Sequence, residues 1–169
     1  MNKIRALVVD DEPDVRDLLV EYFRDAGHEV SAGCRPGGES PQFWLAPQAR
    51  NAVMLVPLEV SDSSSVRGAL SRPLDAIIHL AAVASGSEAR QDPGQAWVVN
   101  AAGTARLVDS AIALREATGV DPLVLVVSSA EVYGQGPARP RVETDPLCPQ
   151  SPYAASKVGA EVAAMEARR

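Results

Sequence analysis

Short apolar runs alternate along the chain with segments whose apolar residues recur every three or four positions. The runs are rich in β-branched residues and predict buried strands, whereas the recurring pattern predicts amphipathic helices. A first helix is expected between Pro13, at its first turn, and Gly27, which ends it. The predicted strands cover residues 4–9, 28–32, 52–58, 74–80 and 122–128, and the other predicted helices cover 61–70, 95–118 and 152–168.

Strands that alternate with helices and are continuously apolar indicate an α/β fold with a parallel sheet covered on both faces. Right-handed connections then give a three-layer, doubly wound, Rossmann-like domain of five strands that comprises residues 1–169. A strand order of 3-2-1-4-5 is favoured, and a flavodoxin-like order of 2-1-3-4-5 also fits the pattern. Residues 34–50 contain three prolines and two adjacent glycines and are expected to form a long loop.

The charge balance restricts the function classes. The chain has 16 Lys and Arg against 22 Asp and Glu, a net charge of −6, so we expect neither a nucleic acid nor an anionic membrane as partner. The sequence opens without a secretory signal and has no apolar run of membrane-spanning length, which predicts a cytoplasmic protein. Two cysteines, Cys34 and Cys148, are too few for a disulfide framework or a zinc site.

The clearest chemical signal is a tyrosine and a lysine four positions apart in the last predicted helix. Tyr153 and Lys157 share one face of that helix, and a neighbouring ammonium favours the phenolate form that an acid/base tyrosine uses. Ser129 follows the fifth predicted strand, at the sheet edge where open α/β sheets bind their ligands. These three residues predict a site for proton transfer.

Four motifs occur in one order and at coherent spacing: HLAA at 79–82, VVNAAGT at 98–104, VVSSAEVYG at 126–134 and SPYAASK at 151–157. Together they resemble the extended short-chain dehydrogenase/reductases that act on nucleotide sugars. Within that family the chain is most similar to the branch of GDP-mannose 4,6-dehydratases and GDP-6-deoxymannose reductases. The resemblance covers residues 31–169.

The resemblance implies specific roles for individual residues. The catalytic group would comprise Ser129, Tyr153 and Lys157, with Glu131 in the place of the dehydratases' general base. The cofactor would be NAD(P). Arg35, just after the second predicted strand, suits a 2′-phosphate and favours NADP, although an exposed loop arginine is an equally open interpretation. The other implied residues of the cofactor site are Glu59, Val60, Ala81, Ala82 and Asn100. Among them, Asn100 would hold the long helix against the fourth strand.

The first thirty residues lack the T-G-x-x-G-x-x-G pattern with which that family binds a diphosphate. Asp10, Pro13 and Arg16 stand where the three glycines are expected. Residues 1–30 instead resemble the first strand and helix of a response-regulator receiver domain. That resemblance implies a magnesium site at Asp10 and Asp11, which is incomplete because the other receiver residues are missing.

The two resemblances lead to a hypothesis of an engineered chimera in which a receiver-like unit, residues 1–30, precedes a truncated dehydrogenase-like portion, residues 31–169. This hypothesis expects no native catalytic activity and no bound cofactor. One alternative is a residual NAD(P)-dependent nucleotide-sugar dehydratase or reductase module, and a second is a magnesium-binding phosphorelay module. The resemblance also implies a homodimer through the helices at 95–118 and 152–168.

Overall fold

A computed structural model describes residues 3–10, 12–37, 54–136 and 138–167. The strands are β1 (Arg5–Val9), β2 (Glu29–Cys34), β3 (Met54–Pro57), β4 (Ala76–His79) and β5 (Leu123–Val126). The helices are α1 (Pro13–Asp25), α3 (Ser63–Ala69), α4 (Gly86–Gln91), α5 (Pro93–Ala96), α6 (Gly103–Thr118) and α7 (Pro152–Glu166), with a π-helical turn η2 (Trp97–Ala102) and a 3₁₀ turn η3 (Ala130–Tyr133). Most of the predicted loop at 34–50 lies outside the described residues.

The five strands form one parallel sheet in the order β3-β2-β1-β4-β5. Ala6 of β1 pairs with Val30 of β2 on one side and with Ala76 of β4 on the other. The favoured order is confirmed, and the flavodoxin-like order is excluded because β3 pairs with β2 and not with β1. The fold is therefore the predicted Rossmann-like α/β arrangement.

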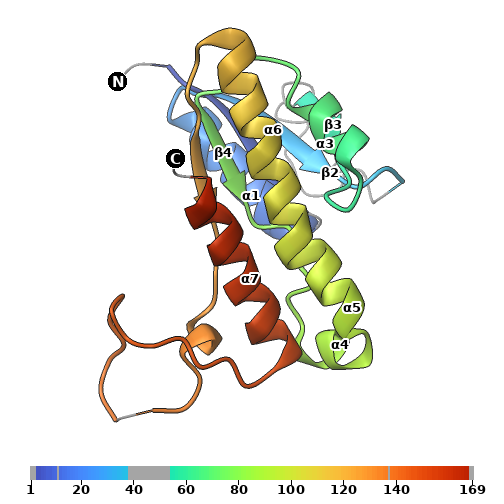
Figure 1. Ribbon diagram of the computed structural model, residues 1–169. Helices are drawn as coiled ribbons and strands as arrows, with labels where there is room; N and C mark the ends of the chain where they lie inside the picture. The colour runs from blue at the N-terminus through green and yellow to red at the C-terminus, as the bar shows by residue number, and fades with distance from the viewer. Residues whose placement is uncertain (1–2, 11, 38–53, 137, 168–169) are drawn as a thin grey trace.

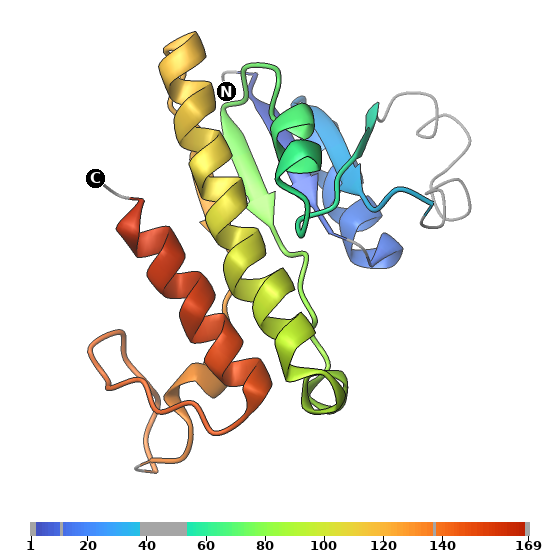
Figure 2. The same ribbon diagram turned by 45° about the vertical axis from the view of Figure 1, so that its right-hand side comes forward.

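Helices cover the two faces of the sheet unequally (Figures 1 and 2). Leu7, Ile77 and Leu107 belong to the larger core on the face covered by α3, α6 and α7. Val8 and Val30 pack with Val20 of α1 in a smaller core on the other face. The sheet thus has a well-covered face and a face that α1 covers over β1 and β2.

β5 departs from the predicted coverage of both faces. Leu123 and Leu125 are 73% and 54% exposed, whereas Val124 between them packs against the larger core. Leu125 pairs in register with Ile78, which contacts the smaller core, so the exposed side chains lie on the face of α1. The prediction of continuous coverage is therefore wrong for this strand, because α1 does not reach it.

The predicted helix at 95–118 is divided into three parts. Asp92 caps α5 by accepting the Gln95 N–H at 2.9 Å, and the chain then passes through η2 before α6 begins at Gly103. α6 ends at Gly119, whose φ of 71° is the left-handed conformation that favours glycine at a helix end. No helix among the described residues combines the length and apolar character needed to cross a bilayer.

Candidate cofactor and catalytic site

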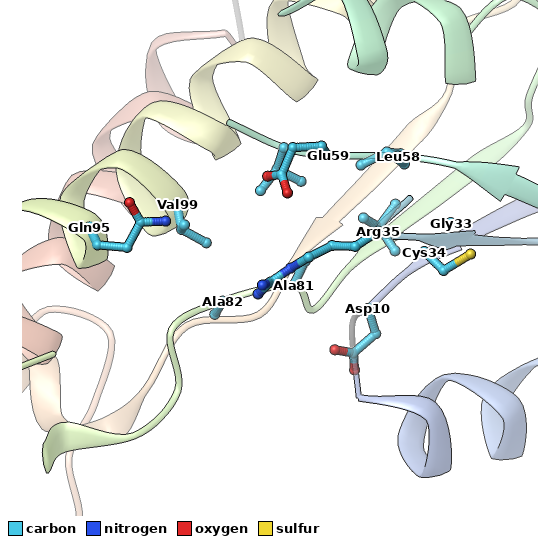
Figure 3. A pocket seen from close by; sticks show the side chains of 12 residues that line it. Asp10, Gly33, Cys34, Arg35, Leu58, Glu59, Ala81, Ala82, Gln95 and Val99 are labelled. Carbon is cyan, nitrogen blue, oxygen red and sulfur yellow. The ribbon is translucent and has the colours of Figure 1, made fainter. Parts of the chain in front are cut away.

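The carboxyl ends of β1, β2 and β4 and the segment after β3 surround a small, open cleft (Figure 3). Six of the predicted residues lie in its wall: five that the resemblance implied for the cofactor, and Asp10, which it implied for a metal. Arg35 leaves the end of β2, and its side chain extends toward Ala81 and Ala82. The structure thus brings together Asp10, Arg35, Glu59, Val60, Ala81 and Ala82, which the sequence distributes over 73 positions.

Glu59 is held as a carboxylate at the rim of this cleft. Its Oε1 accepts hydrogen bonds from the Ser61 N–H at 3.0 Å and the Ser61 hydroxyl at 2.7 Å. Burial raises the pKa of Glu59, but the Ser61 hydrogen bonds and the Arg35 guanidinium outweigh this effect, and the pKa falls below its usual value. The ionised carboxylate is therefore an acceptor available to a ligand hydroxyl or amine.

Asn100 lies next to the cleft and does not line it. Its side chain is 1% exposed and is fully engaged: Oδ1 accepts the Val83 N–H at 2.8 Å, and Nδ2 donates to the Val83 carbonyl and to the Ser156 hydroxyl. Asn100 therefore joins η2, the segment after β4, and α7. These contacts hold the start of the long helical segment against the chain after β4, as the resemblance implied, so Asn100 positions the wall of the cleft.

Tyr153 and Lys157 lie one turn apart on α7, as the sequence predicts. Lys157 is 5% exposed, and its Nζ donates to the Val127 carbonyl at 2.9 Å. Burial lowers the pKa of Lys157, and the Asp10 carboxylate partly opposes this by raising it. The ammonium is therefore fixed at the carboxyl end of β5, on the side of the sheet edge where the cleft lies.

Ser129 and Glu131 occupy the segment that joins β5 to the loop before α7. Ser129 caps η3 by accepting the Glu131 N–H at its Oγ, and the hydroxyl proton remains able to donate. Glu131 accepts the Ser151 hydroxyl at 3.3 Å, and Ser151 in turn caps α7. Glu131 thus connects η3 to the start of the helix that carries Tyr153 and Lys157.

The predicted magnesium site gains no support from the structure. Asp10 lines the cleft and is buried, whereas Asp11 lies outside the described residues. In the part of the chain that the structure describes, no three His, Cys, Asp or Glu side chains gather into a possible metal site. Mg²⁺ requires more oxygen ligands than Asp10 supplies.

Sequence reasoning missed several residues of the cleft. Gln95 and Val99 line it from the segment that carries α5 and η2, and Figure 3 shows both across from Arg35. Gly33 and Cys34 line it from the end of β2. For Gly33 and Cys34, the position at the end of a predicted strand was the available signal. Gln95 and Val99 gave no signal, because neither residue type by itself indicates a ligand contact.

Comparison with known proteins identifies the wider group. The model of the NAD dependent epimerase/dehydratase family matches residues 17–169. GDP-mannose 4,6-dehydratase of Sordaria araneosa is 31% identical over 143 residues, which cover 83% of this chain and 25% of that protein.

Two solved structures are also similar to the chain. UDP-glucose 4-epimerase of Thermus thermophilus in complex with NAD is 28% identical, with a TM-score of 0.78, and the match covers 96% of this chain and 50% of the epimerase. The dTDP-glucose 4,6-dehydratase DesIV of Streptomyces venezuelae, with NAD and TYD bound, is 28% identical, with a TM-score of 0.78 and 96% and 51% coverage. The chain thus spans a quarter to a half of the length of these relatives.

These matches bear on the two resemblances of the sequence. The family match begins at residue 17, inside the receiver-like segment, and no comparison supports a receiver domain or an engineered chimera without activity. Because both solved relatives hold NAD, the expectation of no cofactor also lacks support, and the first alternative hypothesis is favoured. The chain belongs to the NAD dependent epimerase/dehydratase family.

Proposed function

We propose that the chain forms the dinucleotide-binding portion of an NAD(P)-dependent nucleotide-sugar epimerase or dehydratase. The observation that carries the proposal is the buried Lys157 ammonium, held against the Val127 carbonyl one turn after Tyr153. Burial of an ammonium costs free energy, and ionisable groups that proteins nevertheless keep buried in this way are concentrated at functional sites. The names of the relatives support the substrate class.

The residues of the cleft fit the adenosine half of such a cofactor. Leu58, Val60 and Ala81 provide apolar contact for a base, and the Glu59 carboxylate provides an acceptor beside them. Arg35 supplies a guanidinium in the same cleft, which favours a 2′-phosphate and hence NADP. The entrance to α1 fits less well, because Asp10 places a carboxylate there.

The side chains of α7 and of the segment after β5 would have separate roles in the reaction. The nicotinamide supplies hydride transfer at a sugar carbon when it is bound. Tyr153 exchanges a proton with the sugar hydroxyl through its Oη, and the adjacent Lys157 ammonium stabilises negative charge on that oxygen. Ser129 donates a hydrogen bond to the same sugar oxygen. In a dehydratase, the Glu131 carboxylate would take up the proton that leaves the carbon next to the oxidised one.

Lysine variants test the proposal directly. Lys157→Met removes the ammonium and keeps the side-chain length, so we expect it to weaken NADP⁺ binding at least tenfold in isothermal titration calorimetry. Lys3→Met is the matched control, because Lys3 is exposed near the opposite end of β1 and pairs with Glu29 at 3.9 Å. NAD⁺ titrated in parallel shows which dinucleotide the Arg35 guanidinium favours. Absence of measurable binding of both dinucleotides to the unmodified chain would refute the proposal.

The proposal includes self-association through α6 and α7. A groove between these helices is lined by Trp97, Ala101, Ile112 and Val162, of which Trp97 is 47% exposed and Val162 is 54% exposed. An exposed apolar groove between two small-residue helices suits the same helices of a second copy.

A further inference from the structure

The turn from β1 into α1 contains a buried side-chain carboxylate, that of Asp10. The Asp10 N–H donates to the Gly33 carbonyl at 3.4 Å, which ties the turn to the end of β2. The Asp10 side chain is 7% exposed and lines the cleft with Arg35. Its Oδ1 accepts the N–H of Glu12, the residue that precedes α1, at 3.1 Å. The carboxylate therefore already binds an amide at the positive end of this helix.

The charges around Asp10 are largely those of Arg16 and Lys157. Arg16, 1% exposed in α1, donates from Nη1 to the backbone carbonyl of Asp10 at 3.5 Å, and its Nε forms an ion pair with Asp17 at 3.0 Å. The Asp10 carboxylate also raises the pKa of Lys157, so the two charges act on one another across the strand ends. A helix N-terminus with free amides would attract a phosphate, whereas here the amide and the surrounding positive charge already serve a carboxylate.

We propose that Asp10 is a specificity residue whose carboxylate substitutes for a phosphate of the ligand at the start of α1. The cleft then favours ligands without a phosphate at this point, and a dinucleotide must displace the carboxylate or bind beside it. Two negative groups cannot share the Glu12 amide without repulsion. This inference rests on the proposed function, because it assumes that the same cleft receives the dinucleotide.

Neutral substitutions at Asp10 provide the test. Asp10→Asn keeps an oxygen acceptor for the Glu12 amide, so the turn is preserved while the charge is removed. We expect at least tenfold tighter NAD⁺ binding by calorimetry and less than a twofold change for adenosine, which has no phosphate. Asp10→Ser, which also offers an oxygen, provides a second neutral variant if the first does not fold.

Glu12→Gln is the matched control, because it removes an equal charge from an exposed position two residues away. We expect it to change NAD⁺ affinity less than threefold. The inference is overturned if unmodified protein and the Asp10 variants bind NAD⁺ equally, or if Glu12→Gln matches their gain. If the unmodified protein binds neither dinucleotide, the proposed function fails; if it binds NAD⁺ and the Asp10 variants bind it no more tightly, only this inference fails.

Discussion

His79 ends β4 inside the protein, next to the site and without a part in its proposed chemistry. It is 2% exposed, and its Nε2 lies 3.1 Å from the Thr104 hydroxyl. Burial, assisted by the Lys157 ammonium, lowers the pKa of His79 from 6.5 to about 4. The unfolded chain therefore takes up a proton near pH 6.5, whereas the folded protein resists protonation until about pH 4. Folding must lose stability as the pH falls through this window.

We expect the unmodified protein to lose about 2 kcal/mol of unfolding free energy through His79 between pH 7.5 and 5.0. His79→Gln retains a hydrogen-bonding group for Thr104 but does not titrate, so its stability should fall less over the same range. Urea unfolding of both proteins at the two pH values measures the difference. Parallel losses in the two proteins would show that His79 is not the group responsible.

At the level of helices, the contact of α7 with η2 depends on a glycine. A Cβ built at Gly159 would lie 2.7 Å from the Trp97 ring and 2.8 Å from the Ala101 Cβ. Both distances are shorter than van der Waals contact, so the helices approach one another only because the side chain is absent. The same contact places Ser156 of α7 beside Asn100 of η2, at 2.8 Å. Close packing here therefore helps to position the helix of Tyr153 and Lys157.

Two glycine-to-alanine substitutions separate packing from helix propensity. Gly159→Ala should lower the unfolding free energy by roughly 1–3 kcal/mol, because the new methyl group forces α7 away from η2. Gly68→Ala in α3 has no atom within 4 Å of the new Cβ and should raise it by about 0.5–1 kcal/mol. Thermal and urea unfolding compare the two. An equal gain in stability from both would contradict the packing argument.

For the whole molecule, the groove between α6 and α7 makes the state of association a testable property. Val162→Glu introduces a charge into this groove and should convert a dimer at tens of micromolar into a monomer in sedimentation velocity. Leu18→Glu is the matched control, because Leu18 is 67% exposed on α1, away from the groove. A monomeric unmodified protein at these concentrations would refute the proposed dimer.

Much of the architecture followed from periodicity. The parallel sheet was predicted because apolar runs alternate with helical patterns, and the observed strand order was the favoured one of two orders that the pattern fitted. The division of the helix at 95–118 was missed, because a π-helical turn of six residues is too short to alter the apolar pattern of the whole segment visibly. The exposed face of β5 was missed for a different reason. Whether a helix covers this face depends on the position of α1, and the residue types of Leu123 and Leu125 give no information about that position.

The sequence predicted which residues belong to the candidate site better than it predicted the hydrogen bonds that they make. The spacing of Tyr153 and Lys157 indicated their shared face, since that spacing is local to one helix. The Lys157 contact with the Val127 carbonyl spans 30 residues and required the fold. Asn100 was expected to hold the long helix against the fourth strand, and its bonds to Val83 and Ser156 do so, although these particular partners depend on the packing of the folded chain.

β5 leaves one end of the sheet with a row of backbone amides and carbonyls that no neighbouring strand of the described chain satisfies. Residues 122–129 carry no charge, so the strand lacks the lysine or inward-facing carboxylate that usually discourages pairing between molecules. A partly unfolded copy could add its own extended segments there, one after another. We therefore expect heating of the chain described here to favour aggregation through the open edge of β5.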